Sequence, residues 1–532
     1  MSERRPASRR GMVGALVVLL WLGGLGLLVR REYFRPDTER LAEAAMRVTP
    51  GAVYYGVMQG DRQIGFASST VDTAATTISV DDYLVADLPV GGRVHRASAQ
   101  THVVLSRALR MKSFDVTFTG DADPIIARGH VESDSVLRLL LSTGNDTPVD
   151  TQVIKIAGPI LLPTLVPLAV ALTGTPKVGR QLRLPVFDPV GLAPREVTVG
   201  IRAESSFVLA DSAGFDPEMG KWRGMEPVVV RAFEVRADTG VGAAGFSGWV
   251  DEQGRVVRTS QLGFELRRLP YEVAFENWRL TSDSRAAQAA RVSEDRDILE
   301  TTAIGANRRL SSSVVSLAVR FSHAELAGFD LTSPRQEMHG DTLFVRREAA
   351  SQLAATYALP DGGRRLMPEL TMAEPLVQST HPEIVKLANQ IAGRQRAPRI
   401  VAERINRWVY DSLQKRITFG IPSALQVLRS RSGDCNEHAQ LYVALARAAG
   451  IPARIAAGLA YIDGKFYYHA WPEVYLREWV AVDPTFGQFP ADAAHLRFVV
   501  GGLGRQAELL RLMGRLKVEV LKARGEGPGA RD

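Results

Sequence analysis

Alternation of hydrophobic and polar residues dominates the chain from about residue 52 to 280. In segment 114–119, Phe, Val and Phe alternate with Asp, Thr and Thr, and segment 197–202 has a similar pattern. A period of two turns one face of a strand toward a core and the other toward solvent. Turn signals such as Glu252-Gln253-Gly254 separate these runs. We therefore predict a β-rich domain over residues 50–280, built as a mainly antiparallel sheet or half-barrel.

The pattern changes after this domain. Residues 281–297 are polar and charged, which is typical of a linker or a solvated helix. Residues 298–350 return to strand-like alternation, for example around Val314 to Val319. They predict a second, small β unit.

Helical spacing appears in the C-terminal third. Apolar residues recur at three- and four-residue intervals from Pro382 and again from Val401. A third helix is expected to begin near Asp434 and to end at Gly450, since a glycine followed by a nearby proline commonly ends a helix. Strand-like runs follow at 453–461, 466–476 and 478–483.

Residues 11–29 form an uncharged apolar stretch. As a helix its 19 residues would extend about 28 Å, enough to cross a hydrocarbon core. Four arginines precede the stretch and two follow it directly, so the positive-inside rule places residues 1–10 as a cytoplasmic tail. We expect a single-pass signal anchor with the rest of the chain extracytoplasmic, in the periplasm if the cell has two membranes. A cleavable signal peptide and a twin-arginine export signal are the alternatives.

A second uncharged stretch, residues 156–176, contains four prolines. Spaced prolines remove backbone donors and disfavour a regular helix. We interpret the stretch as a buried or cavity-lining segment, with a membrane-associated loop as the alternative. Residues 501–532 carry an apolar stripe at helical spacing, which predicts a C-terminal helix and tail.

Composition narrows the function classes. The chain has 532 residues, 45% of them hydrophobic and 23% charged, which is ordinary globular usage and leaves room for several domains. The formal net charge is +7, and nearly all basic residues are arginines spread along the chain. Without a basic patch, no nucleic-acid partner is expected.

Cysteine usage carries the main chemical signal. Cys435 is the single cysteine, which excludes an internal disulfide and a cysteine-rich zinc site. The expected helix places it in the first turn, where unpaired N–H groups favour a thiolate. A nucleophilic thiol also needs an imidazole to exchange protons and a group that orients the imidazole. His469 and Asp483 lie on the two strands that follow and could meet on the sheet face against the cysteine helix.

Three blocks carry a family resemblance: Gly433-Asp434-Cys435, His469-Ala470-Trp471 and Val482-Asp483-Pro484-Thr485. In this order they resemble the transglutaminase-like superfamily, over residues 377–500. The resemblance implies a papain-like α+β catalytic domain, so the whole chain is expected to be α+β. It also implies Cys435 as nucleophile, His469 as acid and base, and Asp483 as the orienting group. Asn436 stands where animal transglutaminases have tryptophan, and no acidic cluster resembles their calcium sites.

The reaction implied is acyl transfer on protein, peptide or peptidoglycan-like amides through a thioester. Resolution by water makes a protease or amidase, and resolution by an amine makes a transamidase. The Cys435 backbone N–H is expected to hold the oxyanion, with Ser423 or Gln426 as candidates for a second donor. No cofactor and no metal are expected.

Other interpretations compete with several of these assignments. Cys435, Glu437 and His438 could form a metal site, but a single helical turn supplies too few ligands for a closed zinc centre. His495 is interpreted as structural, although it could border the cleft. A catalytically idle scaffold, or a β-rich domain that binds lipid or an envelope partner, are the alternative functions.

Overall fold

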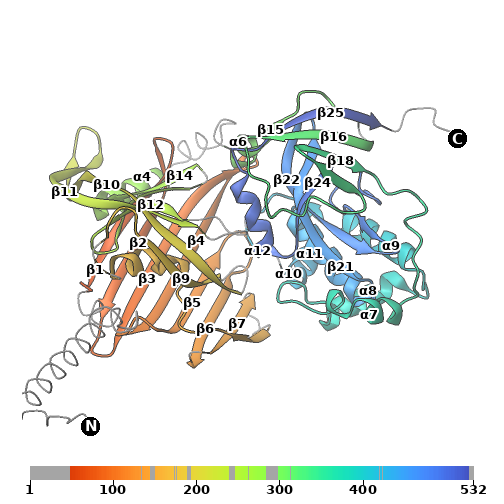
Figure 1. Ribbon diagram of the computed structural model, residues 1–532, viewed down its shortest axis with the longest axis horizontal. Helices are drawn as coiled ribbons and strands as arrows, with labels where there is room; N and C mark the ends of the chain where they lie inside the picture. The colour runs from red at the N-terminus through yellow and green to blue at the C-terminus, as the bar shows by residue number, and fades with distance from the viewer. Residues whose placement is uncertain are drawn as a thin grey trace, which may run out of the picture.

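The computed structural model describes residues 48–525 except 134, 144–149, 173, 175, 189–192, 239–245, 262, 283–296, 312, 419 and 422. The N-terminal half forms one large antiparallel sheet, and the C-terminal half packs helices and smaller sheets beside it (Figure 1). This confirms the predicted β-rich N-terminal region.

The large sheet has fourteen strands in the order β8 to β1 followed by β14 to β9. The first strand therefore pairs with the last one near the centre, where Tyr54 lies opposite Leu269. The strands are β1 (Gly51–Gln59), β2 (Arg62–Thr73), β3 (Thr77–Val90), β4 (Arg93–Ser106), β5 (Met111–Thr119), β6 (Ile125–Ser133), β7 (Val136–Thr143), β8 (Asp150–Lys155), β9 (Gln181–Asp188), β10 (Ala193–Asp216), β11 (Lys221–Asp238), β12 (Ser247–Asp251), β13 (Val256–Gln261) and β14 (Phe264–Leu269).

The large sheet has two wings, strands β3–β7 and strands β9–β12. The proline-rich stretch 156–176 packs between them. It forms η1 (Pro163–Leu165) and α3 (Val166–Leu172). Leu162 and Leu165 pack with the core of β3–β7, whereas Val166 and Val170 pack with the core of β9–β12. The prediction of a buried, cavity-lining segment is confirmed.

The linker region is only partly described. η2 (Glu272–Glu276) and α4 (Asn277–Ser282) follow the large sheet, and α6 (Ile298–Thr302) precedes the C-terminal half. Residues 283–296, at the centre of the predicted linker, lie outside the described residues.

A four-stranded sheet has the order β17, β18, β16, β25. Its strands are β16 (Val314–Ser322), β17 (Gln336–His339), β18 (Thr342–Arg346) and β25 (Lys517–Gly525). The prediction of a helix over the C-terminal stripe is wrong for β25, because Val518 and Val520 alternate with exposed residues and pair with β16. Only α12 (Leu503–Gln506) and η4 (Ala507–Arg511) are helical there.

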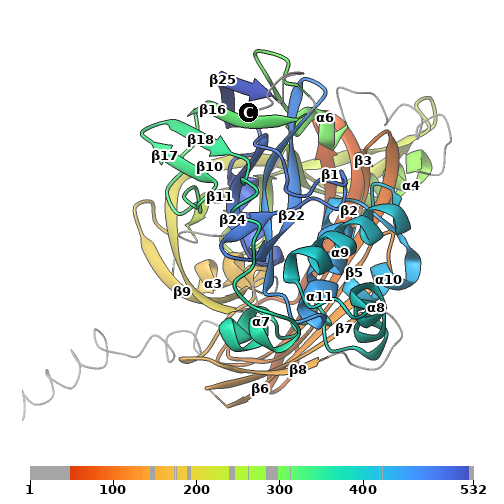
Figure 2. The ribbon, with the colours of Figure 1, turned by 90° about the vertical axis from the view of Figure 1, so that its right-hand side faces the viewer.

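The remaining C-terminal elements surround the helix α11 (Cys435–Ala448), which is almost completely buried. Three helices pack on one side of α11, and strands β21 and β22 pack on the other (Figure 2). The elements are α7 (Asp361–Leu366), η3 (Pro368–Leu370), α8 (Pro382–Ala392), α9 (Pro398–Ser412), α10 (Ala424–Ser430), β15 (Ile304–Gly305), β19 (Gln414–Lys415), β20 (Ser432–Gly433), β21 (Ala453–Ile462), β22 (Lys465–Tyr475), β23 (Trp479–Ala481) and β24 (His495–Val500).

The two halves meet at the β3–β4 turn. A Cβ on Gly91 would lie 2.1 Å from Ile417 Cδ1, so the turn contacts the loop that precedes α10. The Gly92 N–H donates to Asp297 at the start of α6 with a distance of 2.6 Å. A Cβ at Gly91 would require the Ile417 side chain to move, and the positive φ of Gly91 (57°) also disfavours other residues there.

The predicted membrane span at residues 11–29 lies outside the described residues. Among the helices of the described part, none has the length and apolar character needed to cross a bilayer.

Gly458 provides a test of how tightly β21 and β24 pack. A Cβ at this position would lie 1.9 Å from the Leu496 carbonyl oxygen, whereas one at Gly305 of β15 meets nothing within 4 Å. Both glycines belong to the same sheet. We expect Gly458→Ala to lower the free energy of unfolding by about 1–3 kcal/mol, as overpacking usually does, with little change in Gly305→Ala. Urea unfolding measures both, and equal midpoints would contradict the packing argument.

Candidate active site

Cys435 is the first residue of α11, and the residues around it form a capping box. The Asp434 side chain accepts from the Asn436 N–H, and the Glu437 carboxylate accepts from the Asp434 N–H, each at 2.9 Å. These bonds satisfy two of the otherwise unpaired donors of the first turn. The cap therefore fixes where the helix begins and where the thiol lies.

The thiol faces the strand that carries His469. Cys435 is partly buried, and the Ala470 N–H, next to His469 in β22, lies near the thiol and acts to lower its pKa. The helix start and the predicted imidazole are thus brought to one place.

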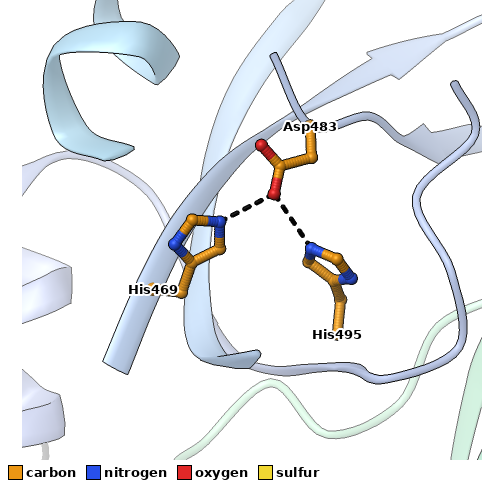
Figure 3. A group of neighbouring side chains, drawn as sticks. All are labelled: His469, Asp483 and His495. Atoms are coloured by element: carbon orange, nitrogen blue, oxygen red, sulfur yellow. Dashed lines mark hydrogen bonds and ion pairs between the residues drawn. The ribbon is translucent and has the colours of Figure 1, made fainter. Parts of the chain in front are cut away.

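The side chains of His469 and Asp483 are hydrogen-bonded to each other. The distance from His469 Nε2 to Asp483 Oδ2 is 2.7 Å, and both side chains are buried (Figure 3). His469 comes from β22 opposite Gly458 of β21, and Asp483 follows β23. Two neighbouring strands therefore supply the pair, as the sequence predicts.

The Asp483 carboxylate accepts four hydrogen bonds. Oδ1 accepts from the N–H groups of Thr485 and Phe486 at 2.7 and 3.1 Å. Oδ2 accepts from His469 and also from His495, the latter at 3.0 Å. Burial alone would raise the pKa of Asp483, but the two histidines hold it well below its usual value. The carboxylate is therefore ionised and can only accept.

This fixes the tautomer of His469. Because the ionised Asp483 has no proton to donate, Nε2 of His469 must carry one. In a neutral imidazole Nδ1 is then the basic nitrogen. Figure 3 shows Nδ1 on the side of the ring away from Asp483. Phe486 stacks on the ring with centroids 4.7 Å apart and planes 3° from parallel, which limits its rotation.

His495 is the residue that the sequence interpretation undervalued. Its Nε2 contacts Asp483 and its Nδ1 contacts Asp492 Oδ1, each at 3.0 Å. Two acceptors on opposite nitrogens require both nitrogens to be protonated, so the ring is an imidazolium. Burial opposes this charge, but the two carboxylates raise the pKa of His495 to about 9. The signal was weak in the sequence because the preceding strand β23 and a long turn separate His495 from His469.

The start of a helix was expected to favour the Cys435 thiolate, but other effects at this site oppose it. Burial raises the pKa of the Cys435 thiol well above its usual value, and the nearby Asp434, Glu437 and Asp483 raise it further. The Ala470 N–H acts in the opposite direction without reversing the shift. Burial and the nearby carboxylates therefore favour the neutral thiol, which needs a base to lose its proton.

The two candidates for a second oxyanion donor differ. The Ser423 hydroxyl exchanges hydrogen bonds with the Gln378 side chain at 3.0 and 3.4 Å, so it supports the start of α10. The amide nitrogen and oxygen of Gln426 are both buried and have no hydrogen-bond partner in the described part of the chain. Gln426 therefore stays a candidate, whereas Ser423 has a structural partner.

Two members of the Cys435, Glu437 and His438 set have hydrogen-bond partners around the helix start. Glu437 accepts from Thr418 and from the Asp434 N–H, and His438 Nδ1 contacts the Asp434 carbonyl at 2.6 Å. Within the described residues, the group that could hold a cation is instead His469, Asp483 and His495. Here both imidazoles contact the same carboxylate oxygen at hydrogen-bond distance. Hydrogen bonding accounts for this arrangement without an ion.

Three comparisons with known proteins were made. Residues 385–484 match the family model described as the transglutaminase-like superfamily. A search of the curated proteins finds no match. Among solved structures, a candidate cysteine protease from Cytophaga hutchinsonii shares 17% identity, over 41% of this chain and 89% of that chain, with a TM-score of 0.28.

Two further solved structures are similar. A β-barrel-like protein of a domain of unknown function from Brucella abortus shares 11% identity over 42% of this chain and 95% of that one, with a TM-score of 0.29. A candidate protease from Parabacteroides distasonis shares 11% identity over 56% and 68%, with a TM-score of 0.19. The family match covers the segment that holds Cys435, His469 and Asp483. The C-terminal part of the chain therefore carries a domain of the transglutaminase-like superfamily.

Proposed function

We propose that the protein is a cysteine-dependent enzyme that transfers acyl groups from protein, peptide or peptidoglycan-like amides. The observation that carries this proposal is the proximity of the Cys435 thiol to the Ala470 N–H, beside the hydrogen-bonded pair of His469 and Asp483. A thiol, an imidazole with a free basic nitrogen and an ionised orienting carboxylate are the groups that thioester chemistry needs.

In the proposed reaction, His469 Nδ1 takes the thiol proton as Sγ attacks the amide carbonyl carbon. A C–S bond forms, and the carbonyl oxygen gains the negative charge of the tetrahedral intermediate. The Cys435 N–H, in the first turn of α11, is the donor proposed to stabilise that charge. Collapse of the intermediate breaks the C–N bond, and the leaving amine takes the proton from His469.

The thioester is resolved in a second half-reaction. Water or an amine attacks the thioester carbon after giving a proton to His469, and the C–S bond breaks. The sulfur leaves and regains its proton from His469. Both outcomes use the same residues, so the choice between hydrolysis and transamidation depends on which nucleophile reaches the site.

We further propose that the enzyme acts outside the cytoplasm, anchored to the cell membrane through residues 11–29. The support is the uncharged length of this segment and the arginines that precede it.

The thiol and the imidazole should be coupled chemically. Because burial and nearby carboxylates disfavour the Cys435 thiolate, we expect alkylation by iodoacetamide at pH 7 to depend on His469. His469→Ala should slow labelling about tenfold or more, whereas His130→Ala, an exposed residue of β6, should label like wild type. Mass spectrometry of the Cys435 peptide, with and without EDTA, provides the measurement. Equal rates in wild type and His469→Ala would refute the coupling, and a strong EDTA effect would indicate a bound metal.

The charge of His495 predicts a pH dependence of stability. Its pKa is raised from 6.5 to about 9, so its stabilising contribution is complete below pH 6.5 and is lost as the pH rises through 9. The difference in unfolding free energy between wild type and His495→Gln should fall over this range by up to about 3 kcal/mol. Urea unfolding at several pH values, with His130→Gln as control, tests this. A difference that does not vary with pH would show that His495 is neutral.

The reaction products show whether the enzyme hydrolyses its substrate or transfers the acyl group to an amine. The full chain is incubated with a glutamine-containing protein and a labelled primary amine, and the products are analysed by mass spectrometry. Loss of ammonia with water uptake, or cleavage of the chain, indicates hydrolysis, and incorporation of the amine indicates transamidation. Cys435→Ala should reduce either product by about 10³-fold or more. Unchanged product formation in Cys435→Ala would refute the proposed enzyme and favour an idle scaffold.

A further inference from the structure

A partly open cavity of about 980 Å³ lies against the large sheet. The inner faces of the central strands β1–β4 and β14 form one wall. The η1–α3 segment and the β12–β13 turn form the other. This volume lies at the upper end of the about 300–1,000 Å³ typical of small-molecule sites. The cavity belongs to the β-rich half, whereas the candidate active site belongs to the C-terminal half.

Small side chains create this space. Ala67 of β2 lies opposite Leu84 of β3, which lies opposite Ala99 of β4, so one row across three strands carries two alanines. The neighbouring row carries Ser69 and Thr101. Large apolar side chains at these central inward positions would fill the interior, as they do between the wings and α3. The cavity therefore results from the small side chains at these inward-facing positions.

The lining is mainly apolar, and its charges have partners. Among the described lining residues only Asp82, Glu252 and Arg255 are charged. Asp82 accepts from Ser69 at 2.6 Å and from Thr164 of η1, and burial raises its pKa. Arg255 bonds to Asp251 at 2.8 Å. A strongly charged ligand would find little to pair with, whereas an aliphatic chain would meet an apolar wall.

The chain enters the sheet at the edge of this cavity. Residues 48–51, the first that the structure describes, are part of the lining. The uncharged stretch ends at Val29, so residues 30–47 connect it to the cavity. Eighteen residues span at most about 60 Å even when fully extended. This proximity rests on the membrane anchor proposed above: with residues 11–29 in the bilayer, the connecting segment keeps the cavity within reach of the bilayer surface.

We infer that the cavity binds an acyl chain of a membrane lipid, held between the central strands and α3. The aliphatic chain occupies the apolar space beside Ala67 and Ala99. This second site is distinct from the thiol site, and its existence does not depend on catalysis.

Photocrosslinking of the full chain in phosphatidylethanolamine vesicles tests the inference, with a trace of the same lipid carrying a diazirine in one acyl chain. Mass spectrometry should find lipid adducts on peptides of β1–β4 and α3. Ala99→Trp fills the cavity and should reduce these adducts about tenfold, equivalent to about 1.4 kcal/mol of binding free energy. Gln100→Trp is the matched control, because the neighbouring side chain is exposed and absent from the lining. It should keep the adducts.

A second blocking variant, Ala171→Phe, fills the cavity from α3. It keeps the test valid if Ala99→Trp misfolds. Thermal unfolding shows whether each variant is folded. Adducts confined to residues 11–29 would overturn the inference, and so would cavity adducts that survive in both folded blocking variants. A loss of adducts in Gln100→Trp equal to that in Ala99→Trp would also overturn it. The activity of the Cys435 site is measured in parallel. If that activity is absent, the crosslinking result can still be interpreted, because the two sites are separate.

Discussion

The buried carboxylate of Asp483 is the interaction on which the candidate site depends. Each oxygen accepts two hydrogen bonds: one pair comes from the turn that follows Asp483, and the other from histidines of β22 and β24. The same group thus sets the turn, the tautomer of His469 and the charge of His495. An ionised carboxylate that is fully buried is costly unless its hydrogen bonds are satisfied. Here they are, so the three chain segments cannot move independently without exposing an unpaired charge.

The sequence predicted the parts of the site that depend on local pattern. The residues indicated three of these parts: the start of α11, the order of the three motif blocks, and the alternation in β1–β14. The role of His495 was not indicated, because its contact with Asp483 arises only when β24 packs against the turn that follows β23, although its second partner, Asp492, is near in sequence. The raised pKa of Cys435 was missed for a related reason: burial disfavours the thiolate, and Asp434 and Glu437, which cap the helix, disfavour it further.

The C-terminal strand illustrates how tertiary pairing overrides a helical pattern. The stripe over residues 509–520 fits helical spacing, yet β16 offers an unpaired edge and β25 completes it. Val520 fits both the helical stripe and the strand alternation, so hydrophobic spacing at that position alone could not decide between them. The boundary between the two halves is likewise set by contacts far apart in sequence, where the turn at Gly91 lies against Ile417 ahead of α10. The β-rich half therefore contacts a loop that leads directly into the helices around Cys435.

The pairing of β1 with β14 has a consequence for synthesis of the chain. Tyr54 leaves the ribosome long before Leu269, so the first strand must wait with one edge unpaired while twelve other strands are made. Contacts between residues so distant in sequence form slowly, since the loop between them must be closed first. The two wings can each fold as local hairpins, but the space they enclose exists only after the last strand arrives. An exposed edge during this interval is a site for wrong pairing, so the order of synthesis makes the β-rich half the part of the molecule most dependent on protection while it folds.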